Sequence, residues 1–269
     1  MGLVQKKLKV ERDTLGLYRE VEMQSSREIK GMSEKLILVT FPCTSVSLCE
    51  ALIDRRITEG VNKQCYNGIS VGEECEMVIQ EKFYTAEDLW ELSHRPEYAD
   101  MRLELSEGRL MVMSPAGWKH GGIASWLLRK VGDHVDENRL GMTTAAETGY
   151  ILYKNPDPKG KDTVRAPDVG FIAASRVPDD LPDGYVPFAP DLAIEVVSPN
   201  DQEDEINQKV EEFLKYGTRL VWVMYAARQE VKVHTPGQKL KTLKVGDMLD
   251  GGDVLPGFRV AVQDIFRKP

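Results

Sequence analysis

The sequence predicts an α/β protein in which α-helices flank a mixed β-sheet. After residue 83 the apolar pattern follows the order strands, helix, strands, helix, strands, which is typical of such a sheet. The stretch 119–138 carries a helical apolar stripe that must cover a sheet. The chain contains no internal repeat that would indicate a solenoid or propeller.

Composition excludes a membrane-spanning protein. The 269 residues are 42% hydrophobic and 29% charged, and no apolar run approaches the roughly 20 residues of a spanning helix. The first residues lack the apolar stretch of a secretory signal, and Lys6 stands where a myristoylation signal has Ser or Thr. We therefore expect a cytoplasmic protein.

The net charge of -8, from 43 acidic and 35 basic residues, gives no global positive field of the kind that nucleic-acid-binding proteins often have. A nuclease, however, gathers carboxylates at its metal site and can confine basic residues to one groove. The charge therefore does not exclude a nucleic-acid substrate.

Cysteine and tryptophan usage divides the chain near residue 76. All cysteines precede that point and all tryptophans follow it. Residues 1–76 show little periodicity, so we predict an N-terminal extension that is poorly ordered or of unknown fold, followed by a domain over 77–269. Because the pattern becomes protein-like immediately after Met77, we also hypothesise that Met77 is the native start.

The cysteine spacing does not favour a zinc site. Five, fifteen and nine residues separate the four cysteines, with no close pair and no histidine nearby. Free thiols are the expected state in a cytoplasmic chain. The cysteines are Cys43, Cys49, Cys65 and Cys75.

The first half of the second domain begins with a short helix and a hairpin. Thr85 can cap the helix, with Asp88 three residues on. Residues 102–113 alternate on both sides of Glu107-Gly108, which is a hairpin signal. A helix is then expected from about Lys119 to Asn138, with Gly141 ending it.

The second half alternates strands and loops around one further helix. The helix follows Ser198 and ends at Tyr216-Gly217. Polar loops are expected over 154–165 and 178–184. The expected strands cover 147–153, 168–172, 192–197, 219–225 and 230–234.

Glu195 interrupts an otherwise apolar strand, and a lone carboxylate buried there would need a paired cation. The alternative is a strand face open to water, and the strand alone does not decide between them. Asp168 begins the preceding strand, so pairing of the two strands would put the carboxylates roughly 5 Å apart. Two carboxylates suit Mg²⁺, although Pro-Asp is also a common turn dipeptide.

Lys209 lies on the flank of the second long helix, three and four residues from Ile206 and Phe213. From there its ammonium could reach the sheet edge and neutralise charge on a phosphate undergoing hydrolysis. A surface lysine that extends into solvent is the alternative.

Pro167-Asp168, Glu195 and Lys209 resemble the site of the PD-(D/E)XK nuclease superfamily, in which two carboxylates and a lysine bind metal and cleave phosphodiesters. Val197 occupies the usual lysine position. The chain is similar to the branch whose lysine lies on the following helix, the Uma-two family of restriction-endonuclease-like proteins. This resemblance implies a restriction-endonuclease-like fold in which Asp168 and Glu195 bind Mg²⁺ or Mn²⁺.

The resemblance extends over about Phe83 to Phe266, and the order of its fragments is more specific than any one of them. Where the family often has Asp-Pro after the Trp-containing strand, this chain has Tyr225-Ala-Ala227, a departure expected to affect only a turn. The matching fragments are 103–115, His120, 165–171, 190–199, Lys209 and 217–222.

Two further residues are accessory candidates for catalysis. His120, near the start of the first long helix, could contact the scissile phosphate or a water, or serve only as a helix-end hydrogen-bonding group. Glu104, on the hairpin, could face the same cleft or face water. His134 and His234 are interpreted as structural.

The 154–165 loop holds Lys154, Lys159, Lys161 and Arg165 beside the proposed metal strand. These side chains could contact substrate phosphates, or the loop could be a solvated hairpin tip. No side chain can be assigned to base recognition.

The preferred hypothesis is a Mg²⁺-dependent endonuclease acting on DNA, in the form of a homodimer if it cuts both strands. The alternatives are an inactive nuclease-fold module that binds nucleic acid or protein, and a phosphoesterase acting on small molecules.

Overall fold

The computed structural model describes residues 83–157, 160–181, 183–199 and 201–267, together with the strands 25–28, 36–42, 61–65 and 74–81. The chain divides into two compact units, Met1–Phe83 and Tyr84–Pro269. Across these described ranges, no helix is both long enough and apolar enough to cross a membrane.

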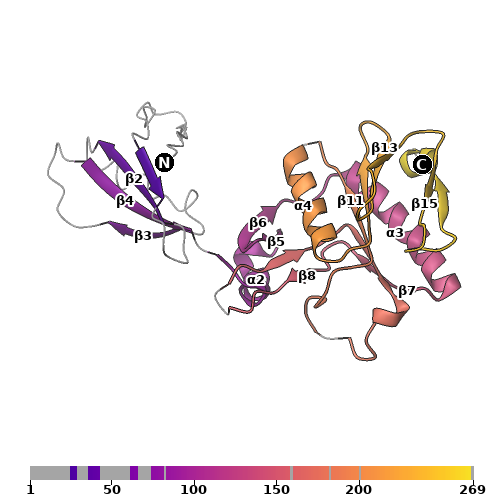
Figure 1. Ribbon diagram of the computed structural model, residues 1–269, viewed down its shortest axis with the longest axis horizontal. Helices are drawn as coiled ribbons and strands as arrows, with labels where there is room; N and C mark the ends of the chain where they lie inside the picture. Colours follow the sequence, from indigo (N-terminus) through magenta and orange to yellow (C-terminus); the bar gives the residue numbers. More distant parts are fainter. Residues whose placement is uncertain are drawn as a thin grey trace. The chain divides into compact units, whose positions relative to one another are not determined.

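The N-terminal unit contains a four-stranded antiparallel sheet, whose order is β1-β2-β4-β3 (Figure 1). Met77 pairs with Val39 inside this sheet, so the division between units falls at Phe83 and not after residue 76. Whether Met77 is the native start stays a prediction, and Cys43 and Cys49 lie outside the described residues. The strands are β1 (Ser25–Glu28), β2 (Leu36–Pro42), β3 (Val61–Cys65) and β4 (Glu74–Glu81).

The second unit begins with the predicted helix and hairpin. Helix α2 (Ala86–Ser93) has a capping box in which the Thr85 and Asp88 side chains each accept from the other's backbone N–H. Strands β5 (Arg102–Ser106) and β6 (Arg109–Met113) pair around Glu107 and Gly108. Both turn residues have positive φ, 47° and 78°, as a type I′ turn requires.

A small sheet of order β6-β5-β9-β8 extends this hairpin. Strand β8 (Tyr150–Tyr153) is shorter than predicted, because Glu147 has a φ of 77° in a turn and cannot continue a strand. Strand β9 (Thr163–Arg165) pairs with β5 and β8 at the end of the segment predicted as a loop. The 3₁₀ helix η2 (Pro96–Tyr98) leads into β5.

The large sheet is mixed, as predicted. Its order is β14-β13-β12-β11-β10-β7, in which only β11 and β12 are parallel. Helix α4 makes the crossover between these two parallel strands. The strands are β7 (Gly141–Ala145), β10 (Val169–Ala173), β11 (Leu192–Val196), β12 (Leu220–Tyr225), β13 (Glu230–His234) and β14 (Lys241–Leu243).

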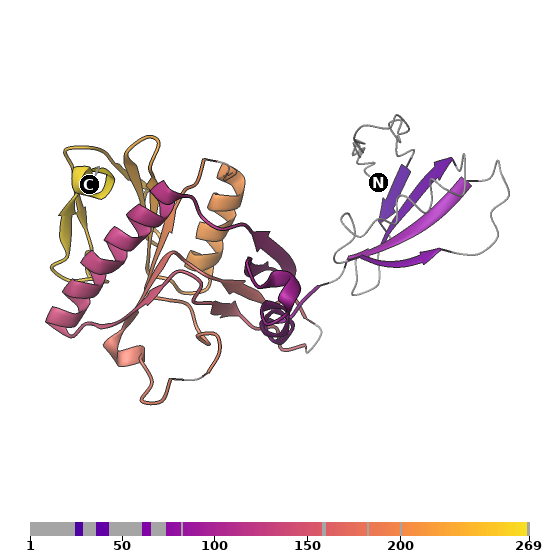
Figure 2. The same cartoon turned by 180° about the vertical axis from the view of Figure 1, so that it is seen from behind.

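Helices α3 (Trp118–Asn138) and α4 (Glu203–Lys215) lie on opposite faces of the large sheet (Figures 1 and 2). Leu127 of α3 packs with Leu192 and Ile194, whereas Phe213 of α4 packs with Ala193. Successive residues of β11 therefore point to opposite faces of the sheet, one covered by α3 and the other by α4. This alternation places Glu195 on the α4 face.

Residue Gly141 does not end α3 directly. The helix ends at Asn138, and Arg139 adopts the left-handed conformation at its C-terminus. Gly141 instead begins β7 with a φ of 149°, where an added Cβ would lie 2.0 Å from the Ile172 carbonyl oxygen. Glycine is thus required for the approach of β7 to β10.

The remaining elements were not predicted. The 3₁₀ helix η3 (Ala174–Arg176) follows β10. Strands β15 (Met248–Asp250) and β16 (Arg259–Ala261) form a two-stranded sheet. Helix α5 (Val262–Phe266) ends the second unit and adds to the core on the α3 side.

Candidate active site

The site lies where the chain passes from the small sheet to the large one. Strand β9 ends at Arg165, and β10 begins after Asp168. Since β10 and β11 are antiparallel with Val169 opposite Ile194, the same register puts Asp168 opposite Glu195. The predicted pairing of these two strands is therefore confirmed.

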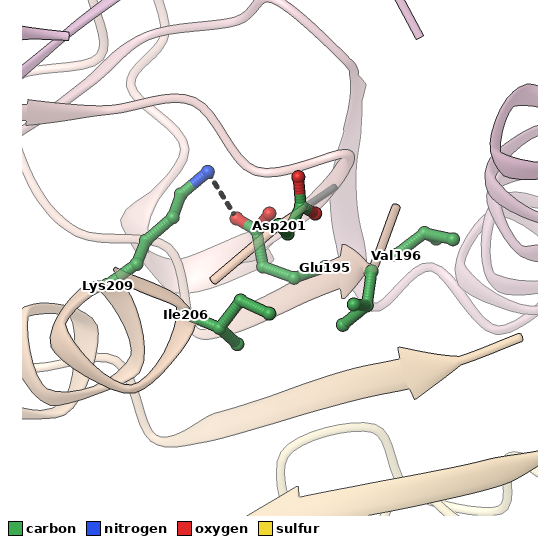
Figure 3. A pocket seen from close by; sticks show the side chains of 6 residues that line it. Glu195, Val196, Asp201, Ile206 and Lys209 are labelled. Atoms are coloured by element: carbon green, nitrogen blue, oxygen red, sulfur yellow. Dashed lines mark ion pairs between the residues drawn. The ribbon is translucent and has the colours of Figure 1, made fainter. Parts of the chain in front are cut away.

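Glu195 is paired with a cation and not solvated. Its side chain is 12% exposed, and Lys209 Nζ lies 2.8 Å from its Oε1 (Figure 3). This contact is an ion pair without hydrogen-bond geometry, so the buried Oε1 has no hydrogen-bond donor among the described residues. Burial raises the pKa of Glu195 to about 7, against Lys209, and the charges of Asp168 and Glu104 add to the increase.

Lys209 extends from α4 into the protein and not into solvent. Its Nζ donates to Glu104 Oε1 at 2.9 Å and to the Ala166 carbonyl oxygen at 3.2 Å. Burial lowers the pKa of Lys209, but the charges of Glu104 and Glu195 more than compensate and raise it. The site therefore contains a fixed ammonium ion beside Glu195.

Asp168 accepts hydrogen bonds on both oxygens. Arg102 Nη1 donates to Oδ1 at 3.1 Å, His120 Nε2 lies 3.0 Å from the same oxygen, and the Val196 N–H donates to Oδ2 at 2.8 Å. Burial raises the pKa of Asp168, but His120, Lys209 and Arg102 outweigh it and lower the pKa to about 2. Asp168 is thus ionised at any physiological pH.

His120 joins the site from the first turns of α3. Its Nδ1 lies 3.0 Å from Ser198 Oγ, in the turn that follows β11. The hydrogen bond to Asp168 raises the pKa of His120, although burial opposes it. The structure thus brings His120 against Asp168, while its contact with a scissile phosphate or a water stays a prediction. Ser198 was not predicted as a site residue.

Glu104 is buried and does not face water, with 1% of its surface exposed. In addition to Lys209, it accepts from Arg165 Nη1 at 3.1 Å, and Arg165 Nε donates to Glu212 Oε2 at 2.6 Å. Burial raises the pKa of Glu104, but Lys209, Arg165 and Arg102 lower it below the usual value. Its oxygens are thus engaged by protein cations, among them the Lys209 ammonium.

The hypothesis that the 154–165 loop holds phosphates is wrong for Arg165, which is 4% exposed and paired with buried carboxylates. Lys154 forms an exposed ion pair with Glu87, and Lys159 lies outside the described residues.

A signal in the sequence indicated that one face of β5 is polar and points into the protein. Arg102, Glu104 and Ser106 alternate with leucines, so these three polar side chains share one face of the strand.

The carboxylates can accommodate one divalent ion if water completes its coordination. Within the described ranges, no group of three or more His, Cys, Asp and Glu side chains is arranged to hold a metal. Mg²⁺, however, often takes only one or two carboxylates. The Glu195 carboxylate, whose buried Oε1 contacts only Lys209 among the described residues, and the ionised Asp168 opposite it fit this requirement. Glu195 also lines a small pocket together with Val196, Asp201 and Lys209.

Comparisons with known proteins show the family and the fold of the chain. The family model Uma2, described as "Putative restriction endonuclease", matches residues 86–263. The crystal structure of "a putative nuclease belonging to DUF820 from Anabaena variabilis ATCC 29413" superposes with a TM-score of 0.56 and 21% identity, covering 68% of this chain and 97% of that chain. No curated protein matches the chain. At this identity the structure shows a shared nuclease fold, and the family match, which spans more than half of the sequence, shows that the chain belongs to the Uma2 family.

Proposed function

We propose that this protein is a metal-dependent endonuclease that hydrolyses phosphodiester bonds in DNA. The observation that carries the proposal is the convergence of Asp168, Glu195 and Lys209, from two strands and a helix. Membership of a family of restriction-endonuclease-like proteins supports nuclease chemistry.

Each group has a distinct role in this scheme. Mg²⁺ or Mn²⁺ held by Asp168 and Glu195 would supply Lewis-acid chemistry at the scissile phosphate. The Lys209 ammonium, fixed by Glu104, stabilises the negative charge that develops on the phosphate oxygens. His120 holds Asp168 in place and can exchange a proton at its ring with an incoming group.

An exposed aromatic side chain at the start of α3 suits a nucleic-acid substrate. Trp118 is 96% exposed and precedes His120 by two residues at the start of α3. Aromatic rings in this position can stack on unpaired bases without sequence preference. Cleavage of both strands by an enzyme with one site per chain would further require a homodimer.

The second candidate function is an inactive module that binds nucleic acid or protein. The ion pair between Arg102 and Asp168 favours it, since a cation from the protein already neutralises one metal-binding carboxylate. Such a module would keep the fold but would not hydrolyse the substrate.

The test is cleavage of supercoiled plasmid by the full chain with Mg²⁺ or Mn²⁺. We expect the wild-type protein to nick or linearise the plasmid and Asp168→Asn to lose this activity. Asp136→Asn, which changes an exposed carboxylate in the last turns of α3, is the matched control and should cut as the wild type does. Cutting that persists in Asp168→Asn excludes this site. Absence of both cutting and calorimetric metal binding, with DNA or protein binding retained, favours the module.

A further inference from the structure

The cations of the site differ in how firmly they are held. Arg165 is the most buried, with 5% of its side chain exposed and hydrogen bonds from both Nε and Nη1 to carboxylates. Lys209 is 12% exposed and contacts two carboxylates and a carbonyl oxygen. Arg102 is 19% exposed and stands at the first residue of β5.

The contacts of Arg102 are also the weakest of the three. Only Nη1 donates to Asp168, at 3.1 Å, and the distance from Nη2 to Glu104 Oε1 is 3.5 Å. Its Nε is buried without a hydrogen-bond partner in the part of the chain that the structure describes. Arginine normally binds carboxylates with two parallel hydrogen bonds, so this guanidinium is held mainly by charge.

The carboxylates of the site are already matched by protein cations. A divalent ion that binds Asp168 would add two positive charges at a buried location, where uncompensated charge is unfavourable. Ionisation of Glu195 can offset part of this charge, and movement of one protein cation towards solvent offsets more of it. The carboxylates are Glu104, Asp168, Glu195 and Glu212, and the cations are Arg102, Arg165 and Lys209, with His120 beside them.

We propose that Arg102 occupies the cation position at Asp168 in the metal-free protein and leaves it when a divalent ion binds. This inference rests on the proposed metal-dependent function. Arg102 shares Asp168 Oδ1 with His120 and is the most exposed of the three cations that are always charged. Its departure leaves His120 as the remaining side-chain contact of Asp168 Oδ1, while Arg165 and Lys209 keep Glu104 in place.

Removal of Arg102 should therefore change the metal affinity in the opposite direction to removal of a residue that positions Asp168. If Arg102 competes with the metal, its removal strengthens metal binding; if it orients Asp168 for the metal, its removal weakens binding. Isothermal titration of Mn²⁺ into the full chain without DNA distinguishes the two. We expect Arg102→Gln to bind Mn²⁺ about tenfold more tightly than the wild type, since a hydrogen bond between charged groups no longer has to break.

The matched control is Arg129→Gln, which removes an exposed charge from α3 and reports the effect of net charge alone. It should change the affinity less than about twofold. Unchanged or weaker Mn²⁺ binding by Arg102→Gln, relative to this control, overturns the inference but leaves the proposed nuclease intact. If neither the wild type nor Arg102→Gln binds Mn²⁺ at millimolar concentration, the proposed metal dependence fails as well.

A test without mutation covers the case in which Arg102→Gln does not fold. Crystals of the wild-type protein soaked in Ca²⁺ or Mn²⁺ should show the ion at Asp168 and Arg102 Nη1 displaced from its present 3.1 Å contact with Oδ1. An ion bound at Asp168 with this contact unchanged overturns the proposal.

Discussion

Two carboxylates of the site, Asp168 and Glu195, have different surroundings, which shift their pKa values in opposite directions. On one side, Asp168 is 1% exposed and has a pKa lowered to about 2; on the other, Glu195 is 12% exposed and has a pKa raised to about 7. Burial acts to raise the pKa of both carboxylates. At Asp168 the partners outweigh burial, because this carboxylate accepts three contacts, whereas Glu195 Oε1 has a single ion pair in the described part of the chain.

This difference separates the tasks of two carboxylates that face each other across one ladder. Asp168 provides a permanent negative charge. Glu195 changes protonation close to neutral pH, so it is the carboxylate whose charge responds to an added cation. The difference in pKa between the two carboxylates depends on their neighbours, and mutations of these neighbours test it. Beside Glu195 they are Lys209 and Glu104; beside Asp168 they are Arg102, His120 and Ser198.

The largest effect is expected on the Glu195 side, from Glu104→Gln. This change removes the carboxylate that Lys209 and Arg165 share in a buried network, and breaking such a network lowers the free energy of unfolding by about 3–5 kcal/mol. Urea unfolding measures it. Glu107→Gln, an exposed position in the turn of the same hairpin, should stay within about 0.5 kcal/mol of the wild type. A loss below about 1 kcal/mol for Glu104→Gln would show that Glu104 does not hold the network together.

Next in size is the loss of the ammonium beside Glu195. Lys209→Met should reduce plasmid cleavage about 100-fold, or about 2.7 kcal/mol in the transition state, because the ammonium that stabilises the developing charge is lost. Lys215→Met, on the exposed end of the same helix, is the control and should cut at the wild-type rate. Equal rates for both variants would remove Lys209 from the mechanism.

The acid stability of the metal-free protein tests the Asp168 side. Its pKa is about 2 when folded and 3.8 in an unperturbed side chain, so Asp168 contributes about 2 kcal/mol above pH 4, lost as the pH falls towards 2. Urea unfolding with EDTA should show the stability advantage of the wild type over Asp168→Asn narrowing from pH 5 to pH 3. A constant difference over this range would contradict the low pKa.

Glu195 should show the opposite sign in the same experiment. Its folded pKa of about 7 exceeds the usual 4.5, so its stabilising contribution is complete below pH 4.5 and is lost as the pH rises through 7. The wild type should therefore lose stability relative to Glu195→Gln between pH 6 and pH 8. If stability changes with pH in the same direction for both carboxylates, their pKa values are not shifted in opposite directions.

The smallest effect is expected for Ser198→Ala. The Ser198 hydroxyl lies 3.0 Å from His120 Nδ1, and loss of one such hydrogen bond lowers stability by about 0.5–1.5 kcal/mol. Thermal unfolding measures it, with Ser125→Ala on the exposed side of α3 as control. No difference between the two variants would mean that Ser198 does not hold the imidazole ring.

Local pattern was enough to predict much of this fold. The Glu107-Gly108 turn, the capping box at Thr85 and the helix ending at Asn138 depend on residues within a few positions of one another. Strand β7 escaped prediction because Gly141-Met-Thr-Thr-Ala145 has little apolar alternation and gains its place from pairing with β10. Strand β9 also escaped prediction, because its three residues are too few to show a strand pattern.

The sequence by itself determined which residues are candidates for the site, namely Asp168, Glu195 and Lys209, whose order along the chain matches one family. Only the tertiary structure decided their environment. Arg165 and Lys209 meet Glu104 across 61 and 105 residues of sequence, and Arg102 meets Asp168 across 66. Such partners leave no trace in local spacing, yet they set the charge of each carboxylate, because a pKa in a buried site depends on the nearest charges and donors and not on the order of residues along the chain.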